Sequence, residues 1–446
     1  MTAQVMARVT TALRRTQMRY RQGRVVGASG NRITVAGLSS LARLGDQVLV
    51  LHHGGHLGAE VVLAEGDLVH LLPEGPADGV LLGDPARLMP PLVFAPHDDW
   101  IGRVIDPDGR PLDGAPLLPG LVPRRLRAAP PAPHDRRAMG ARVETGFALF
   151  NTLLPLARGQ RIGLFAGSGV GKSTLLADLA RQVEADVIVI GLVGERGREL
   201  RHFVEEVLGP DGMARSVVVA ATSDRAPQVR RKCALAATAV AEHFRDAGRQ
   251  VLLLLDSVTR FAEAHREIAI AAGEPSSLRG YPASTGPAIA GLCERAGPGS
   301  GEAGDITAIY SVLVAGSDMD EPVADMLRGV LDGHVVLDRA IAERGQFPAV
   351  DLLRSVSRSL PDVASVQENA LIGEARSHLG TFDRAALMIR SGLYTPGSDA
   401  AIDAAIACQP ALERFLTLRE PRGTPASFAA LRQALAKANP RQRQAE

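Results

Sequence analysis

The sequence is short of cysteine and has no long apolar run, and both shortages narrow the class of protein. Its three cysteines lie far apart and lack the spacing of metal ligands, which predicts reduced, small core residues in a cytosol. They are Cys233, Cys293 and Cys408. No apolar run approaches the roughly 18 residues of a membrane span, and no signal-peptide core is present. We therefore expect a cytoplasmic protein, peripheral to a membrane at most.

Aromatic residues and lysine are also scarce. Tyr20 is the only aromatic residue before Phe94, so the N-terminal region offers no platform on which nucleic-acid bases could stack. The net charge of +1 gives no reason to expect a polyanionic partner. Lysine occurs only at Lys172, Lys232 and Lys437, and arginine supplies almost all of the positive charge. A lysine inside a glycine-rich loop is therefore harder to attribute to chance.

What remains is typical of a globular chain. The 446 residues are 46% hydrophobic and 22% charged, enough for two or three domains, each with its own core. Residues 1–21 begin with Val5, Val9 and Leu13 at helical spacing and contain several arginines, whereas the first acidic residue is Asp46. This pattern favours docking to a partner or an anionic membrane surface, and a solvated helix end fits it equally well; an organellar transit peptide fits less well. The arginines are Arg8, Arg14, Arg15, Arg19 and Arg21.

Short β-like runs separated by turn residues fill residues 22–92 and predict a small closed barrel. The expected strands contain residues 24–26, 32–35, 47–51, 60–63, 68–72 and 80–82. His52, His53 and His56 sit in a glycine-rich turn between two strands; a solvated hairpin tip is favoured there over a metal cluster.

Residues 140–350 alternate apolar strands with helices, which predicts a mainly parallel sheet covered on both faces. A turn-rich segment and a proline-rich connector precede this region. The expected strands are 161–165, 186–193, 216–220, 251–255, 306–314 and 334–337, and the expected helices are 172–184, 197–208, 227–247, 258–271 and 321–331. The chain beyond about residue 360 is mostly helical, and the polar tail 440–446 is expected to be disordered.

A phosphate-binding loop joins the first of these strands to its helix. Glycines there allow the backbone to wrap a phosphate, and the amides of the new helix point at the anion. Lys172 would reach the β- and γ-phosphates of ATP, and the Ser173 hydroxyl would ligate Mg²⁺. Ala166 stands where the strict pattern has glycine, and an ordinary glycine-rich loop is the alternative. The nucleotide-binding residues are Gly167, Ser168, Gly169, Val170, Gly171, Lys172, Ser173 and Thr174.

Two further strands end in carboxylates. Asp256 ends a buried apolar strand, where it would hold Mg²⁺ through the ion's water shell, although a strand end without function is the alternative. Glu195 follows the strand between the loop and Asp256, and it could polarise the water that attacks the γ-phosphate. Glu199 lies one helical turn later and is expected to pair with arginines. A charged helix start with intrahelical salt bridges is the alternative here.

These residues carry a resemblance to a known family. The runs at 165–173, 194–199 and 256–261 resemble the flagellar protein-export ATPases, also called flagellum-specific ATP synthases. That family is related to the alpha and beta subunits of rotary ATP synthases. Further matches are Arg266-Glu-Ile-Ala, Gly273-Glu-Pro, Gly280-Tyr-Pro-Ala, Glu294-Arg-Ala-Gly, Leu331-Asp-Gly-His, Phe347-Pro-Ala-Val-Asp and Ser355-Val-Ser-Arg. The segment at 284–288 departs from the bulkier residues usual in the family.

The resemblance implies an α/β chain with an amphipathic helix (1–21), a β-barrel (22–92), a RecA-like P-loop ATPase domain (93–360) and a C-terminal helical domain (361–446). It also implies a homohexameric ring with ATP at the subunit interfaces. Glu195 matches the catalytic glutamate, and Arg196 and Arg260 match arginines close to the γ-phosphate. Phe347 matches the aromatic residue that stacks on adenine, and Arg358 matches the finger given to the neighbouring subunit's ATP. From the sequence alone, a core aromatic and a surface arginine would be the preferred interpretation of the last two.

The expected function is Mg²⁺-dependent ATP hydrolysis that energises flagellar protein export from the inner face of the cytoplasmic membrane. Implied partners are a stator-like negative regulator at the N-terminal helix, a central coiled-coil stalk, export-gate membrane proteins and chaperone–substrate complexes, with peripheral membrane contact and no nucleic acid. The alternatives are an injectisome secretion ATPase, a hexameric nucleic-acid translocase of the transcription-terminator type, and a non-catalytic ring subunit. The presence of Glu195, Lys172 and Arg358 together argues against the last.

Overall fold

The computed structural model describes residues 3–14, 19–314 and 319–438. It divides into two compact units, each described here by itself. The first unit contains Met1–Pro130, Val187–Ala247 and Leu253–Arg295, and the second contains Pro131–Asp186, Gly248–Leu252 and Ala296–Glu446. The tail at 440–446, which is expected to be disordered, lies outside the described residues, and so does Arg15. None of the helices within the described ranges combines the length and the hydropathy that a membrane crossing requires.

The first unit begins with the predicted N-terminal helix, α1 (Ala3–Arg14). One of its arginines does not face solvent: Arg8 is only 3% exposed. Its guanidinium forms an ion pair with Asp99 and donates hydrogen bonds to the carbonyl oxygens of Pro119 (3.0 Å) and Leu118 (2.5 Å). The hydrogen bond from Arg8 lowers the pKa of Asp99. The helix is therefore attached to its own chain through Arg8.

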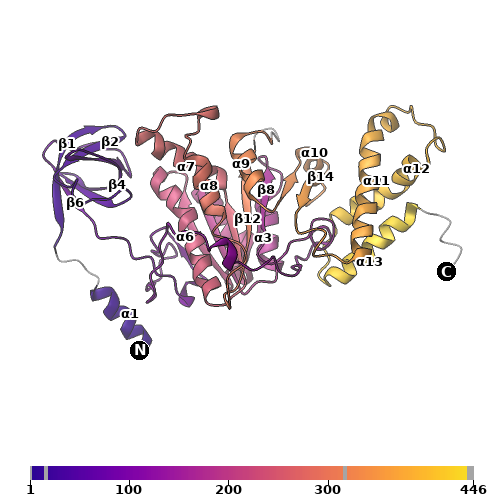
Figure 1. The fold of residues 1–446 in the computed structure, drawn as a ribbon, viewed down its shortest axis with the longest axis horizontal. Coiled ribbons are helices and arrows are strands. Elements are labelled where there is room, and N and C mark those ends of the chain that lie inside the picture. The colour runs from indigo at the N-terminus through magenta and orange to yellow at the C-terminus, as the bar shows by residue number, and fades with distance from the viewer. Residues whose placement is uncertain (1–2, 15–18, 315–318, 439–446) are drawn as a thin grey trace. The chain divides into compact units, whose positions relative to one another are not determined.

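Six strands then close the predicted barrel in the order β1-β2-β5-β4-β3-β6 (Figure 1). The buried barrel core includes Val25, Ile33, Val35, Val50 and Leu71, and along β2 and β3 the buried residues alternate with more exposed ones. The strands are β1 (Arg21–Ser29), β2 (Arg32–Ala36), β3 (Gln47–His52), β4 (Gly55–Glu65), β5 (Leu68–Pro73) and β6 (Pro85–Leu88).

One predicted barrel strand is wrong. Residues 80–82 lie in a loop, and the closing strand is β6, which pairs with both β1 and β3. The glycines on either side of the loop, Gly79 and Gly83, have positive φ angles of 81° and 93°, which an extended strand cannot contain. Leu81 and Leu82 are consequently 62% and 71% exposed. These two leucines give the loop the apolar pattern of a strand, but they do not pack into the barrel core.

The histidine turn is a hairpin tip between β3 and β4. His53 and His56 are exposed, and His52 is half-buried at the end of β3. Across the described residues no three histidine, cysteine or acidic side chains gather in a way that could hold a metal ion. The hairpin interpretation therefore fits the structure.

The rest of the first unit alternates strands and helices. Strands β9 and β10 pair in parallel from Ser216 opposite Ile188 onward, and β10 pairs in parallel with the short β7. The bounds are β7 (Val104–Ile105), β9 (Val187–Glu195), α4 (Gly197–His202), η3 (Phe203–Leu208, a π-helix), α5 (Gly209–Met213), β10 (Ser216–Thr222), α6 (Pro227–Asp246), β11 (Val251–Asp256), α7 (Val258–Ala271) and α8 (Thr285–Cys293).

The second unit has four strands and the C-terminal helices. Strand β8 pairs in parallel with both β12 and β13, and β14 is antiparallel to β13. The bounds are α2 (Ala148–Asn151), β8 (Arg161–Ala166), α3 (Lys172–Gln182), β12 (Ile306–Leu313), α9 (Pro322–Val330), β13 (Gly333–Leu337), α10 (Arg339–Glu343), β14 (Val350–Ser357), α11 (Val366–Arg390), α12 (Ala400–Leu416) and α13 (Thr424–Leu435).

The eight-stranded sheet has the order β14-β13-β8-β12-β11-β9-β10-β7. The α/β fold class with a mainly parallel sheet is therefore confirmed. Strand β14 and helix α8 are absent from the sequence-based expectation. Because β14 is an edge strand, polar residues interrupt its apolar pattern, and it does not show the continuous apolar character of a buried parallel strand.

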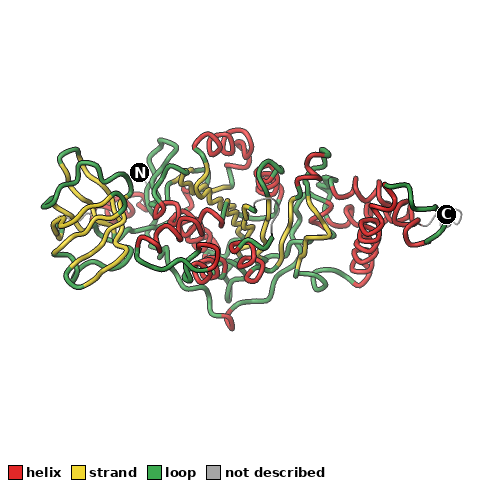
Figure 2. Tube along the Cα trace, turned by 90° about the horizontal axis from the view of Figure 1, so that it is seen from above, coloured by secondary structure: helices red, strands yellow, loops and turns green. Residues whose placement is uncertain are grey.

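Residues 366–438 are mostly helical, as predicted (Figure 2). Helix α11 begins with a capping box: the Glu368 amide donates to the Ser365 hydroxyl (3.2 Å), and the Ser365 amide donates to the Glu368 carboxylate (2.8 Å). This pair satisfies two backbone donors that a helix start leaves without partners. It fixes where the C-terminal helices begin.

We predict that Arg8→Ala releases α1 from the first unit. The variant removes the ion pair with Asp99 and two hydrogen bonds to carbonyl oxygens, so amide exchange in residues 3–14 should accelerate at least about tenfold. In the wild type the pKa of Asp99 is lower in the folded chain than in the unfolded chain, about 3.9. The share of the protection that comes from the ion pair with Asp99 should therefore be complete at neutral pH and decrease as the pH falls below about 4, whereas the two hydrogen bonds to carbonyl oxygens persist.

Hydrogen exchange measured by mass spectrometry tests this attachment. Thr10→Ala, an exposed position on the same helix, is the matched control and should exchange like the wild type. Equal exchange of residues 3–14 in the Arg8→Ala variant and the wild type would contradict the attachment.

Candidate active site

The predicted phosphate loop is a tight turn between β8 and α3 in the second unit. Strand β8 is buried from Ile162 onward, and α3 begins at Lys172. Gly169 and Gly171 have positive φ angles of 78° and 85°, which favour glycine at both positions. Residues 167–174 therefore form one turn whose last members are the first turn of a helix. Such a turn directs backbone amides toward an anion.

Phe347 lies directly against this loop. A side chain at Gly171 would place its Cβ 3.2 Å from both Cδ1 and Cε1 of the Phe347 ring. The ring itself is 53% exposed, so one part contacts the loop and another part remains open. The structure thus brings Phe347 together with the loop across more than 170 residues of sequence, as the resemblance implies.

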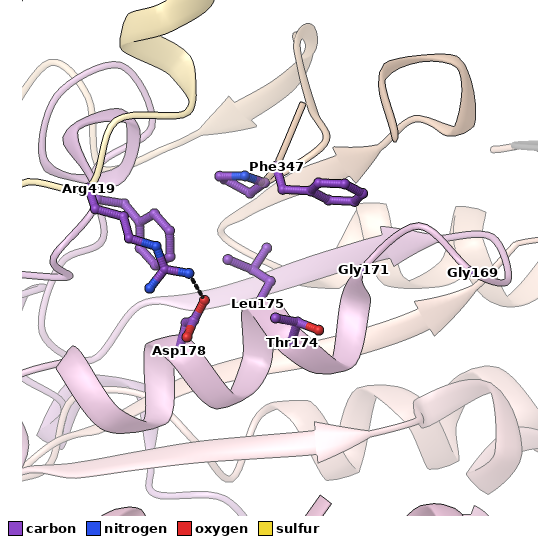
Figure 3. Close-up of a pocket in the computed structure, with 9 residues that line it drawn as sticks. Gly169, Gly171, Thr174, Leu175, Asp178, Phe347 and Arg419 are labelled. Carbon is purple, nitrogen blue, oxygen red and sulfur yellow. Dashed lines mark hydrogen bonds and ion pairs between the residues drawn. The ribbon is translucent and has the colours of Figure 1, made fainter. Parts of the chain in front are cut away.

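The loop and Phe347 line a cavity of about 400 Å³ (Figure 3). Thr174 and Leu175 on α3 contribute to its wall, and Pro348 follows Phe347 on the opposite side. Sequence reasoning missed five other members of the wall: Phe147, Leu175, Asp178, Pro348 and Arg419. No spacing in the sequence indicates them; Phe147 and Arg419, for example, are distant in sequence and meet through an isolated antiparallel bridge.

Glu195, Asp256 and Arg260 gather in the first unit. Glu195 ends β9, Asp256 ends β11, and Arg260 lies in the first turn of α7. A hydrogen bond to Glu263 (2.9 Å) raises the pKa of Arg260, and the negative charges of Glu195 and Asp256 raise it further. Arg260 therefore sits in the field of both predicted carboxylates.

Local geometry fixes Arg260 in this place. Ser257 caps α7, and its hydroxyl accepts a hydrogen bond from the Arg260 amide (3.3 Å). Gly194 has a φ angle of 71°, and a Cβ there would lie 3.5 Å from the Arg260 Cβ. The positive φ angle favours glycine before Glu195, whereas a Cβ there would meet Arg260 at ordinary van der Waals distance.

The other two predicted arginines, Arg196 and Arg358, are exposed. Arg196 pairs with Glu199 (3.3 Å) at the start of α4, as the spacing predicts. Arg358 follows β14 directly and is exposed; its amide donates to the Asp332 carbonyl (3.0 Å), and its guanidinium contacts the Arg328 carbonyl only at 3.4 Å. Arg358 does not belong to the wall of the cavity beside Phe347.

His334 lies close to the Arg358 side chain. Burial lowers the pKa of His334, and the positive charges of Arg328 and Arg358 lower it further. His334 consequently adds no positive charge near Arg358 at neutral pH.

The predicted Mg²⁺ ligands are oxygen donors. Ser173 lies in the first turn of α3, and Asp256 ends β11 and is 5% exposed. The Ser173 hydroxyl and the Asp256 carboxylate are each an oxygen donor of the hard kind that Mg²⁺ prefers. The residues present therefore fit this ion.

Comparisons with known proteins place the chain. The nucleotide-binding domain of the ATP synthase alpha/beta family matches residues 146–357, and the T3SS EscN ATPase C-terminal domain matches residues 364–437. The flagellum-specific ATP synthase of Caulobacter vibrioides is 44% identical over 410 residues, 90% of this chain and 92% of that protein. The flagellum-specific ATP synthase of Salmonella typhimurium is 42% identical, over 89% of each chain.

A secretion ATPase and a solved structure are also similar. The type 3 secretion system ATPase of Xanthomonas euvesicatoria is 42% identical over 89% of this chain and 90% of that protein. The assembled ATPase EscN from the enteropathogenic E. coli type III secretion system has a TM-score of 0.85 and 36% identity, over 93% of this chain and all of that chain. The chain therefore belongs to the ATP synthase alpha/beta family, as an ATP hydrolase of the branch that contains the flagellum-specific ATP synthases and the type III secretion ATPases.

Proposed function

We propose that the chain is the ATP-driven motor of a flagellar protein-export apparatus and works as a homohexameric ring. The observation that carries the ring is the position of Arg358. It is exposed and stands outside the wall of the cavity that the phosphate loop and Phe347 form. An arginine so placed is available to the nucleotide of a neighbouring subunit, where such a group accelerates hydrolysis by about 10³–10⁵.

Each predicted residue has a role in hydrolysis. The phosphate loop and Lys172 bind the β- and γ-phosphates, and Phe347 stacks on the adenine. Glu195 orients and polarises the attacking water. Arg196 and Arg260, with the neighbour's Arg358, meet the negative charge that develops on the transferred phosphoryl group. Ser173 and Asp256 would hold Mg²⁺, which when bound neutralises phosphate charge.

Flagellar cargo is favoured over injectisome cargo by the phosphate loop. The run Phe165-Ala-Gly-Ser-Gly-Val-Gly-Lys-Ser has the flagellar form, and the flagellar relatives align over most of the chain. The similarity to the Xanthomonas secretion ATPase keeps an injectisome motor as the second candidate.

The proposed partners follow from the family and from exposed surfaces. EscN forms a complex with its central stalk EscO, which supports a stalk in the ring proposed here. Helix α11 exposes Val366 (83%) and Leu387 (78%), and the segment after it exposes Leu393 (75%); these apolar positions suit chaperone–substrate complexes. The stator-like regulator at α1, the export gate and a peripheral position at the cytoplasmic membrane complete the proposal. We retain the domain limits 1–21, 22–92, 93–360 and 361–446 as part of it.

Glu195→Gln should lower kcat for ATP hydrolysis at least about 10²-fold and leave ATP affinity within about threefold, because the amide cannot polarise the attacking water. Steady-state phosphate release and equilibrium nucleotide binding measure the two quantities. Glu199→Gln is the matched control, since Glu199 pairs with Arg196 at the helix start, and it should reduce kcat far less. Equal effects of the two variants would remove Glu195 from the proposed role.

Arg358→Ala should also lower kcat at least about 10²-fold, whereas Arg339→Ala, an exposed arginine paired with Glu343, should not. Mixing the Arg358→Ala and Glu195→Gln chains at equal amounts should restore activity. In randomly mixed rings, about a quarter of the interfaces combine an intact Glu195 with an intact Arg358 from the neighbour. Mixtures that stay as inactive as either variant would show that the two residues act within one chain.

A further inference from the structure

The cavity beside the phosphate loop has an end that the proposed mechanism does not use. In Figure 3 the glycines of the loop lie at one end, Leu175 lies in between, and Arg419 and Asp178 meet at the other end. From Gly171 to Asp178 the helix α3 rises about 10 Å. A nucleotide with its phosphates on the loop would therefore direct its base toward Arg419 and Asp178.

Asp178 carries a buried, compensated charge. Its side chain is 4% exposed and forms ion pairs with Arg181 on the same helix and with Arg419. The Arg419 guanidinium also lies over the Phe147 ring, 5.2 Å from the ring centroid. The Asp178 carboxylate therefore has a fixed orientation, because guanidinium groups contact it from two sides.

The Arg419 side chain is not needed to hold its own backbone. The Ala148 amide donates to the Leu418 carbonyl (3.0 Å), and the Glu420 amide donates to the Gly146 carbonyl (2.9 Å). These two bonds already attach residues 418–420 to the segment before α2. Arg419 is nevertheless directed into the cavity wall while 56% of its side chain stays exposed. Its hydrogen bond to Asp178 uses Nη2 and leaves other guanidinium donors for a ligand.

We propose that the Arg419–Asp178 pair reads the base of the bound nucleotide and selects adenine over guanine. The inference rests on the proposed function, because it takes this cavity as the seat of ATP. Arg419 donates a hydrogen bond to a ring nitrogen of the base, and the Asp178 carboxylate accepts one from the exocyclic amino group. Phe347 supplies the stacking face and does not discriminate between purines.

The Arg419 donor and the Asp178 acceptor are complementary to adenine and not to guanine. Adenine presents its N6 amino donor beside the N7 acceptor, whereas guanine presents two acceptors, O6 and N7, on the same edge. Guanine would place O6 against the Asp178 carboxylate, so two acceptors would meet with no proton between them. A site that hydrogen-bonds its substrate rejects an analogue that leaves buried polar groups unpaired.

The test compares ATP with GTP in the full-length chain and two variants. Arg419→Ala removes the donor, and Arg422→Ala is the matched control. Arg422 lies in the same segment and pairs with its own carboxylate, Glu420 (2.7 Å), but is absent from the cavity wall. Dissociation constants of both nucleotides come from competition with a fluorescent ATP analogue, and kcat and KM come from phosphate release.

The wild type should prefer ATP over GTP at least about tenfold in both dissociation constant and kcat/KM. Arg419→Ala should reduce this preference to about threefold or less by weakening ATP binding, with kcat within about twofold, and Arg422→Ala should retain it. Asp178→Asn, whose amide can donate to O6, should shift the preference toward GTP. A wild type without preference, or an equal loss for both nucleotides in Arg419→Ala, would overturn the proposal.

Binding separates this inference from the proposed function. If the wild type binds ATP selectively but does not hydrolyse it, base selection by Arg419 and Asp178 is supported and the proposed motor function is contradicted. If it hydrolyses ATP and GTP equally well, the proposed motor function is supported and base selection by Arg419 and Asp178 is contradicted.

Discussion

The contact between Gly171 and Phe347 is the constraint on which the nucleotide site depends. The glycine turns the backbone into the left-handed region at the start of α3, and the absence of a side chain lets the phenyl ring reach the loop. Any larger residue at 171 would oppose the backbone angle and also push the ring away. The absence of a Cβ at position 171 thus allows the phosphate loop and the Phe347 ring to approach each other closely. The cavity between them is a consequence of that approach.

A second contact stabilises β8 at the end opposite to the phosphate loop. Arg161, the first residue of the strand, forms a bidentate pair with Asp332 at 2.9 and 3.0 Å, and its amide donates to the same carboxylate. Asp332 immediately precedes β13, whose next neighbour along the sheet is β14. The Asp332 carbonyl also accepts from the Arg358 amide. The strand that carries the phosphate loop and the residue proposed as the arginine finger therefore share one anchoring aspartate.

Much of this could be predicted from the sequence. Apolar runs located β8, β9, β10, β11, β12 and β13 within a few residues, because strands buried on both faces have a continuous apolar signal. The glycines and Lys172 located the phosphate loop, since that chemistry requires a contiguous motif. Phe347 and Arg358 became candidates only through resemblance, because a single aromatic or arginine has no local signature.

The sequence-based predictions that were wrong or missing also have physical reasons. Residues 80–82 are apolar, but the glycines around them force a turn, so composition alone mistook a loop for a strand. The edge strand β14 and the Arg419–Asp178 pair depend on contacts between distant segments. Asp178 falls within the expected helix 172–184 and Arg419 within the mostly helical region beyond residue 360, and neither position belongs to a motif. Their meeting follows from the bridge between Phe147 and Arg419, which no periodicity indicates.

The central claim is that the active site is completed by a neighbouring subunit. The most direct measurement is the specific ATPase activity of the wild-type chain against its own concentration, recorded together with its sedimentation. The account predicts that activity per chain rises steeply over the concentration range in which the ring assembles, and then reaches a plateau. Specific activity that stays constant while the chain sediments as a monomer would contradict it.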